Sequence, residues 1–502
     1  MSVLFTSIPG NLIVPFFYAE INSGGSPYQG QARLLLLGQK LAAGNAAAGV
    51  PIGPIQSQRE ADAMFGVGSM LAAMFAIGRR AAPFQPIWAL PLADPAGAKA
   101  AGSITVSTAS AVTGAGVLYL LGRRLVFQVN AADAKETVAA AIAATINAAA
   151  LPVTAAVGGT GSEHIVTVTA LHFGATSNGL EVMVAVDEPN ALTAANTTIV
   201  AMSGGTGIPA LDTALANLGD DEFDFIAAPY SDTVSLNSVR TFLDGQSGRW
   251  SPIKQLYGHY FTASFGTLST LVTLGNGRND EHVSIIGSQA SPTPLWEWAA
   301  SLGAVAVAHL TDAPELSRPL QTLLLPGVLP PRDRSLWWDI ADRQALYVDG
   351  ISGYKVLIDG LVTIDRIVTT YQVTNAGVPD ATFRDVETMA QLMFAVRYLR
   401  VGVSNRHSRQ ALADDNPFNL AEIATPKSVR NTLIHIYNDL VALGVAEKPD
   451  LFAQYVVVER DPNDATRLNA YLPLDVVNQL RVFAANVTAF LQYQSPSSDV
   501  NI

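Results

Sequence analysis

The stretch that most constrains the fold of this chain is Leu480–Tyr493 (LRVFAANVTAFLQY), which precedes a short polar end. In an extended strand, its large apolar side chains would lie on both faces: Val482, Phe483, Val487, Phe490 and Leu491. No Asn-Gly or Asp-Gly turn follows that would bring back a partner strand from the same chain. Such a strand either pairs inside its own fold or is added to the sheet of another chain.

The beginning of the chain favours addition to another chain. Residues 1–30 begin apolar, contain Pro9 and Pro15, and end in a Gly-, Ser- and Pro-rich stretch from Ser23 to Gly30. This composition predicts an extended arm followed by a flexible hinge. We expect three apolar residues of the arm to contact a neighbouring subunit: Leu12, Val14 and Phe16. Arms at both ends are typical of a subunit that exchanges strands with its neighbours.

The composition limits the classes of partner and of chemistry. A chain of 502 residues is expected to form about two to four domains. Charged residues make up only 14%, which favours a surface largely covered by partners, and the net charge of -12 disfavours nucleic acid and anionic membranes. The absence of cysteine excludes disulfides and thiolate metal sites. With no signal-peptide pattern and no apolar run long enough to span a membrane, we expect a soluble protein.

Alternating helix and strand patterns predict an α/β sheet domain made of residues 31–100 and 204–322. The apolar runs Arg33–Gln39 and Phe223–Tyr230 are typical of strands that are buried on both faces of a sheet. A helix is expected over Glu60–Arg80, with Gly66 and Gly68 as positions where it could break. Strands separated by helices specify a sheet that carries helices on both faces.

Residues 101–203 are rich in Ala, Thr, Val and Gly, which predicts an inserted, β-rich α+β domain. A hairpin is expected to turn at Gly122-Arg123. Asp133 and Glu136 form a capping-box pattern, which predicts the beginning of an Ala-rich helix.

The rest of the chain divides into a proline-containing linker, a second α+β domain, and a terminal arm strand with its tail: residues 323–335, 336–479 and 480–502. Asp359-Gly360 is a strong signal for a tight hairpin turn. Thr425-Pro426 predicts the N-cap and first residue of a helix. The sheet that begins with the hairpin would be open to strands added by terminal arms.

No catalytic constellation stands out. The Gly-rich loop Ser203–Gly207 lies between a strand and a helix, as a dinucleotide-binding loop does, but Pro209 follows it and it is not in the first βαβ unit. The acidic residues between 220 and 224 lack the spacing of a calcium loop, and the seven histidines are scattered. We expect no enzyme activity, no cofactor and no metal; the alternative is a nucleotide-binding enzyme that uses residues 203–207.

A cluster of basic residues stands at the end of the helix that is predicted to begin at Phe383, in a chain that is otherwise acidic: Arg397, Arg400, Arg406 and Arg409, with His407. Cations complement the C-terminal end of a helix dipole, which explains the cluster without a partner. The alternative is a basic face that docks onto an acidic protein.

Several segments, taken in order, resemble the tail sheath proteins of contractile-tailed phages, and most closely the Mu-like family. They are MSGGTGIPALDTALANLGDDEFDFIAAPYSD (202–232), TTYQVTNAGVPDATFRDVETMAQLMFAVRYLR (369–400), RHSRQALADDNPF (406–418) followed by ATPKSVRNTLIHIYNDLVALG (424–444), and LPLDVVNQLRVFAANVTAFLQY (472–493). The inserted domain also resembles the protruding domain of such sheaths. The similarity covers nearly all of the chain.

This resemblance implies a structural subunit that forms hexameric rings stacked helically around a tail tube. The sheath contracts and drives the tube through a cell envelope. The C-terminal domain would face the tube, and terminal arms of neighbouring subunits would complete its sheet. The implied partners are other copies of the chain, the tube protein, and the baseplate and tail terminator proteins; the implied location is the virion tail, after assembly in the host cytoplasm. A non-contractile structural or adhesive protein is a further interpretation.

Overall fold

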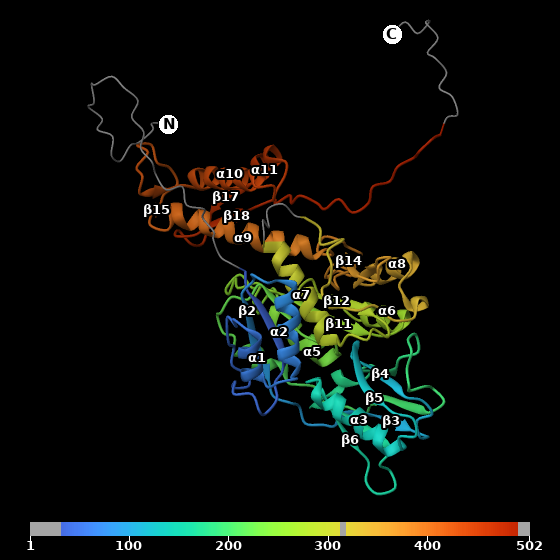
Figure 1. The fold of residues 1–502 in the computed structure, drawn as a ribbon. Coiled ribbons are helices and arrows are strands. Elements are labelled where there is room, and N and C mark those ends of the chain that lie inside the picture. Colours follow the sequence, from blue (N-terminus) through green and yellow to red (C-terminus); the bar gives the residue numbers. More distant parts are fainter. Residues whose placement is uncertain (1–31, 312–317, 490–502) are drawn as a thin grey trace, which may run out of the picture. The chain divides into compact units, whose positions relative to one another are not determined.

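The computed structural model describes residues 32–311 and 318–489 (Figure 1). Several predicted arm residues lie outside the described residues: Leu12, Val14, Phe16, Phe490 and Leu491. The described chain divides into two compact units. Residues 33–390 and the C-terminal segment, residues 476–489, form one unit, and residues 391–475 form the other. We name residues 33–390 the body and residues 391–475 the C-terminal unit.

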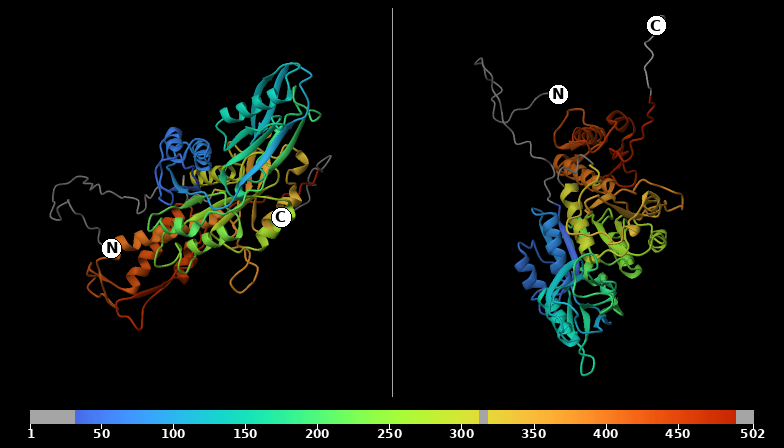
Figure 2. Two further views of the ribbon diagram at one scale, coloured as in Figure 1. Left: turned by 90° about the horizontal axis from the view of Figure 1, so that it is seen from below. Right: turned by 45° about the vertical axis from the view of Figure 1, so that its right-hand side comes forward.

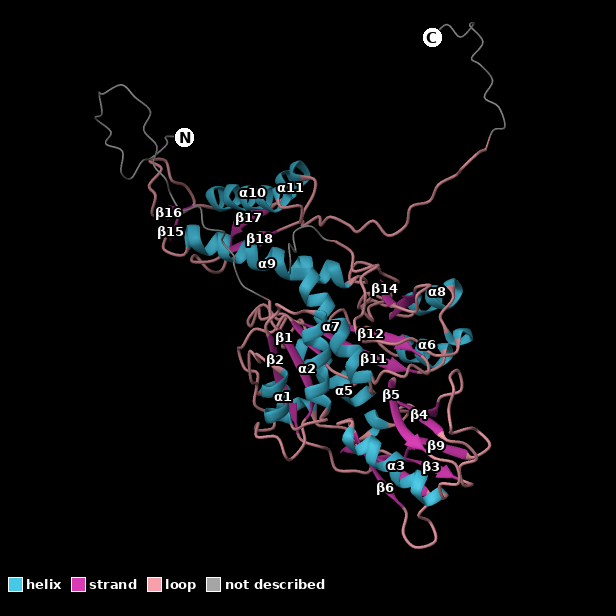
Figure 3. Ribbon diagram, viewed as in Figure 1, coloured by secondary structure: helices cyan, strands magenta, loops and turns pink. Residues whose placement is uncertain are grey.

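A seven-stranded sheet forms the centre of the body (Figure 3). In spatial order its strands are β14 (Val362–Arg366), β13 (Ile351–Val356), β12 (Val283–Ser288), β11 (His259–Phe265), β10 (Phe225–Ala227), β1 (Leu34–Gln39) and β2 (Ile87–Leu92). Neighbouring strands are parallel, except that β13 and β14 are antiparallel. Every residue of β1 is buried, which its continuous apolar run predicted.

The helices of the body alternate with these strands in the sequence. They are α1 (Gln58–Phe65), α2 (Met70–Ala81), α4 (Leu211–Ala216), α5 (Thr233–Leu243), α6 (Leu268–Asn276), α7 (Leu295–Thr311) and α8 (Ile340–Val348). Helices α2 and α7 pack on each other and on the sheet, while α6 and α8 pack on each other. The helix expected over Glu60–Arg80 is broken at the two glycines into α1 and α2, because Gly66 and Gly68 adopt φ angles of 90° and 77° between them. The mixed α/β class of the fold is confirmed.

The hairpin with the Asp359-Gly360 turn does not belong to a separate C-terminal sheet, as its place after residue 336 suggested. Its first strand, β13, lies parallel to β12, with Ile351 opposite Ile285, and the hairpin extends the sheet of the body. Gly360 has a φ of 83° in the turn, which explains why a glycine occupies this position. The sequence pattern identified the hairpin correctly but assigned it to the wrong sheet.

The inserted domain contains two sheets and one helix (Figure 2). The first sheet has the order β6 (Val153–Val157), β7 (Ile165–Phe173), β3 (Lys99–Val106), β9 (Thr197–Ser203). The second has the order β5 (Arg123–Val129), β4 (Gly114–Leu120), β8 (Val182–Val184). Helix α3 (Lys135–Ala148) packs against strands of both sheets.

Two local predictions for the inserted domain need correction. The hairpin turns at Leu121-Gly122, one residue earlier than predicted; both residues have positive φ, 51° and 73°, as a two-residue type I′ turn requires. The capping box at Asp133 is absent, because α3 begins one residue later than such a box needs. Ala134 is the N-cap, and the Asp133 carboxylate instead accepts a hydrogen bond from the backbone N–H of Asn130 at 2.7 Å.

The C-terminal unit is built from helices and short strand pairs. Helix α9 (Val386–His407) begins in the body and continues into this unit. The other elements are β15 (Ala411–Leu412), β16 (Ile423–Ala424), α10 (Pro426–Ala442), α11 (Pro449–Tyr455), β17 (Val457–Arg460) and β18 (Leu468–Tyr471). The predicted cap of α10 is confirmed: Thr425 and Ser428 form a capping box in front of Pro426. Among the described residues, no helix is long and apolar enough to cross a membrane.

Candidate functional site

The segment after residue 476 is neither a strand nor buried. Residues 477–489 are extended without regular secondary structure, so the strand predicted from Leu480 does not form within the described part of its own chain (Figure 1). Val482, Phe483 and Val487 are 80%, 85% and 85% exposed. A strand needs the backbone edge of a partner for its hydrogen bonds, and residues 482–489 pair with no strand in the described part of the chain. Three of the predicted contact residues are therefore accessible to another molecule.

The exposed part of the segment begins directly after an ion-pair network. The guanidinium Nη2 of Arg481 lies 3.1 Å from Asp385 Oδ1 and 2.6 Å from Glu387 Oε2. Arg366 binds the same Asp385 carboxylate through two hydrogen bonds of 2.9 and 2.8 Å. This network was not predicted, because Arg366 and Arg481 are far apart in the chain and only folding brings them to the same carboxylate.

Both edges of the large sheet in the body are already paired. At the β14 edge, the backbone N–H groups of Thr322 and Leu325 donate to the carbonyl groups of Ile364 and Val362, at 2.8 and 2.9 Å. At the other edge, Ile52 exchanges two backbone hydrogen bonds of 2.8 Å with Ala89 of β2. Irregular segments of the same chain thus occupy the positions where an added strand would bind.

The hairpin of β17 and β18 in the C-terminal unit has open edges. Within the described residues, these two strands form a sheet with each other and with no third strand. One face packs toward the apolar core of the unit through Val458 and Leu468. On the outside, Val457 and Tyr471 stand opposite each other and are 49% and 63% exposed. An open, partly apolar hairpin of this kind is a suitable acceptor for an extended segment.

The basic cluster is divided by the fold. Arg400, Arg406 and Arg409 are exposed on and just after α9, whereas Arg397 is buried, with 4% exposure. Other residues pack around α9 near Arg397, since Ala395, Tyr398 and Leu399 are buried too. Arg397 is therefore removed from the predicted basic face, and three arginines remain.

Comparison with known proteins identifies the family. Residues 204–370 match the phage tail sheath protein central domain, and residues 378–490 match the phage tail sheath C-terminal domain. Over 494 residues the chain is 32% identical to the Mu-like prophage FluMu tail sheath protein of Haemophilus influenzae. The match covers 96% of this chain and 99% of that protein. The chain belongs to the phage tail sheath protein family. The family resemblance noted in the sequence is thus confirmed.

Solved sheath structures are similar to this sheath protein over most of its length at low sequence identity. A sheath tail protein from Listeria innocua is 11% identical, with a TM-score of 0.46, and the match covers 90% of this chain and 93% of that one. One from Desulfitobacterium hafniense is also 11% identical, with a TM-score of 0.46 and coverages of 92% and 100%. The helical sheath of the anti-feeding prophage in its contracted state is 12% identical, with a TM-score of 0.46 and coverages of 95% and 99%.

The Gly-rich loop of this sheath protein is hydrogen-bonded to residues outside the loop through the backbone of Gly205 and Thr206. Asn178 accepts a hydrogen bond from Gly205 N at 2.8 Å and donates one to Gly205 O at 2.9 Å. The N–H of Thr206 donates to Ala98 O at 3.0 Å. These contacts join the two connections between the inserted and α/β domains, so the loop acts as a crossover between domains.

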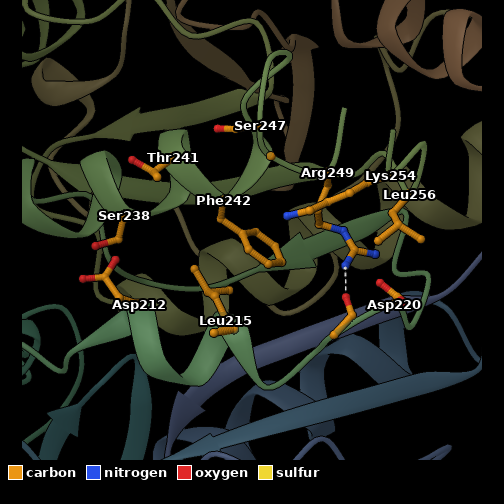
Figure 4. Close-up of a pocket in the computed structure, with 13 residues that line it drawn as sticks. Asp212, Leu215, Asp220, Ser238, Thr241, Phe242, Ser247, Arg249, Lys254 and Leu256 are labelled. Atoms are coloured by element: carbon orange, nitrogen blue, oxygen red, sulfur yellow. Dashed lines mark hydrogen bonds between the residues drawn. The ribbon is translucent and has the colours of Figure 1, made fainter. Parts of the chain in front are cut away.

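A hollow of about 440 Å³ lies between α4, α5 and the loop that follows α5 (Figure 4). Arg249 lies in its wall, and its guanidinium donates to the carbonyl groups of Tyr257, Gly219 and Asp221 at 3.0, 3.3 and 2.5 Å. This arginine holds loops of the sheath protein together. Among the described residues, no group of three or more His, Asp or Glu side chains is arranged to hold a metal ion, and this includes the acidic run at 220–224.

Proposed function

We propose that this sheath protein polymerises as stacked hexameric rings around a tail tube, and that terminal arms exchanged between neighbouring copies hold the polymer together. The observation that carries the proposal is the exposed apolar segment after Arg481, with Val482, Phe483 and Val487. Phe490 and Leu491 would continue it, and Leu12, Val14 and Phe16 would act in the same way at the other terminus. Apolar side chains of this size are stabilised by a partner that covers them.

The acceptor is the β17–β18 hairpin of a neighbouring copy. Two observations support it: both edges of the large sheet are paired within the chain, whereas among the described residues the hairpin pairs with no third strand and exposes Val457 and Tyr471. Each added backbone hydrogen bond contributes about 0.5–1.5 kcal/mol net, and each large apolar side chain buried contributes about 1.5–3 kcal/mol. One arm of several residues would therefore remain attached while the bodies of the subunits move.

Contraction would then use two kinds of contact. The arms give permanent connections, while contacts between bodies are exchanged as the sheath shortens, and they are better in the contracted state than in the extended one. The extended sheath is metastable behind a kinetic barrier. No nucleotide enters this scheme, since the stored energy comes from assembly. The contracting sheath drives the tube through a cell envelope.

The exposed arginines at the end of α9 are proposed to face the tube. Arg400, Arg406 and Arg409 form a local basic surface on a chain with a net charge of -12, and an acidic tube surface would complement it. The baseplate and tail terminator proteins are the partners proposed for the two ends of the sheath. The protein would assemble in the host cytoplasm and act in the virion tail.

Truncation tests the arm exchange. Deleting residues 482–502 removes the exposed segment but keeps Arg481 and the whole body, so we expect a soluble, folded protein that forms no tubular polymer. Deleting only residues 494–502, the polar end, is the matched control and should leave polymerisation intact. Sedimentation and negative-stain electron microscopy measure the outcome. Normal hollow cylinders from the protein without residues 482–502 would contradict the arm model.

A further inference from the structure

Four charged side chains meet where the C-terminal segment lies against the body. Arg366 ends β14, Asp385 precedes α9, Glu387 lies in the first turn of α9, and Arg481 comes from the C-terminal segment. Arg481 bridges the two carboxylates through a single nitrogen, Nη2. The side chains of Arg481 and Asp385 are 13% and 16% exposed, and that of Glu387 is 0% exposed.

The network depends on Arg481, because buried charges need partners. Glu387 accepts hydrogen bonds from Leu320 N at 2.8 Å and from Arg481 at 2.6 Å, one on each carboxylate oxygen. Burial raises the pKa of the Glu387 carboxyl, and the positive charge of Arg481 opposes that rise. An ionised carboxylate that lost Arg481 would remain buried with one neutral donor, which is unfavourable. The contact therefore favours keeping the segment on the body.

The exposure of the chain changes at this residue. Before Arg481, Val477 and Gln479 are partly buried, and the carbonyl group of Leu480 accepts a hydrogen bond from Gln321 at 3.5 Å. After Arg481, every described residue from 482 to 489 is exposed. Arg481 is thus the last described residue of the segment that is held by the body.

We propose that Arg481 is the positioning residue that sets where the C-terminal arm leaves the body, by clamping the chain to Asp385 and Glu387. This inference rests on the arm exchange proposed above. It adds the contact that determines at which residue the arm leaves the body. Without the clamp, the flexible part of the arm would begin further back along the chain. The free arm would be longer and less directed, so it would reach its acceptor on the neighbouring copy less often.

The position of the clamp has a second consequence. Asp385 and Glu387 belong to the beginning of α9, the helix that continues from the body into the C-terminal unit. The clamp therefore holds the first residues of the donated arm and the first turn of α9 at the same place on the body. A movement of the body carries both together.

Trypsin cleavage after Arg481 reports directly on the clamp, because a protease cuts only chain that has come away from the body. We compare unpolymerised full-length protein with Glu387→Gln and with Arg481→Lys, both of which keep a basic residue for trypsin at 481. Mass spectrometry measures the release of a fragment that begins at Val482. This release should be at least about tenfold faster in both variants than in the wild-type protein. The matched control is Glu136→Gln, which also removes a carboxylate from the first turn of a helix, α3, and should leave the rate unchanged.

Polymerisation separates positioning from simple stability. Both variants should keep the melting temperature of the body within a few degrees yet form fewer and more irregular tubes than the wild-type protein. Unchanged cleavage after residue 481 would overturn the clamp, and so would normal tubes despite faster cleavage. If one variant does not fold, the other decides. Failure of the arm exchange itself is a separate result: the protein without residues 482–502 would then polymerise, whatever the cleavage rates.

Discussion

Two histidines in the sheet of the body are held in the neutral state by burial. The ring of His282 stacks on Trp250, with 4.3 Å between ring centroids and 11° between planes, and is 8% exposed. Burial lowers the pKa of His282 to about 3, although the negative charge of Asp244 acts in the opposite direction. Burial also lowers the pKa of His259 well below its usual value. Both side chains are packed in the interior of the body.

The sign of the resulting pH dependence follows from the lowered pKa. Unfolded His282 binds a proton near pH 6.5, whereas folded His282 binds one only near pH 3. The contribution of neutral, buried His282 to the free energy of unfolding is therefore fully present above pH 6.5, and it is lost as the pH falls from 6.5 toward 3. His282→Gln should reduce this loss by about 2–3 kcal/mol at pH 4. Urea unfolding of the unpolymerised protein at pH 7, 5.5 and 4 measures the effect.

The control for this prediction is His435→Gln. His435 is exposed on α10, so its replacement should leave the pH dependence of unfolding as it is in the wild-type protein. An equally steep loss of stability in His282→Gln and in the wild-type protein would show that other groups cause the acid sensitivity.

At the scale of elements, the open β17–β18 hairpin and the exposed segment after Arg481 are complementary. Among the described residues, the hairpin pairs with no third strand and exposes apolar side chains, and residues 482–489 pair with no strand and carry exposed apolar side chains. Both edges of the seven-stranded sheet are already paired. This difference supports the proposal that the β17–β18 hairpin, and not the large sheet, accepts the arm of a neighbouring copy.

Charges placed on the hairpin should block the acceptor. Val457→Lys with Tyr471→Lys should abolish tubes, since two buried ammonium groups would be unfavourable under an added strand. Because both side chains are about half exposed or more in the single chain, the free energy of unfolding of the unpolymerised protein should change by less than about 1 kcal/mol. Electron microscopy and thermal unfolding measure the two effects. Val200→Lys, on the exposed face of β9, is the control and should polymerise; tubes from the double variant would refute this acceptor.

At the scale of the whole molecule, contacts inside the body tie the inserted domain to the α/β domain at two places. Arg332 binds Glu181 at 2.6 Å, and its guanidinium carbon lies 4.1 Å from the ring centroid of Tyr119. At the second place, His172 Nδ1 is 2.7 Å from Asp94 Oδ1, and His172 Nε2 accepts a hydrogen bond from the N–H of Met70. A domain held at two separate points is expected to move together with the α/β domain.

Attachment to the tube is the prediction that belongs to the assembled particle. Changing Arg400, Arg406 and Arg409 together to Glu should reverse the charge of the proposed tube-facing surface and reduce co-sedimentation with purified tube at least about tenfold, most strongly at low salt. Three exposed arginines of the body serve as the control when changed to Glu: Arg59, Arg80 and Arg334. Unchanged co-sedimentation of the first variant would leave these arginines as solvated residues at a helix end.

The sequence by itself determined the features whose causes are local. Three such features were predicted correctly: the apolar run of β1, the cap at Thr425-Pro426 and the glycine in the turn at 360. Each depends on hydrogen bonds or side chains only a few residues apart. The two apolar faces of the segment after Arg481 were readable for the same reason. Family membership followed from the order of several such segments along the chain.

Only the tertiary structure decided which partners these elements find. It placed the hairpin of β13 and β14 in the sheet of the body, buried Arg397, and brought Arg366, Asp385 and Arg481 together. It also left the C-terminal segment without a partner strand in the described part of its own chain. The reason is physical: pairing, burial and charge contacts between distant residues depend on which surfaces meet after the chain has collapsed, and local sequence patterns do not carry that information.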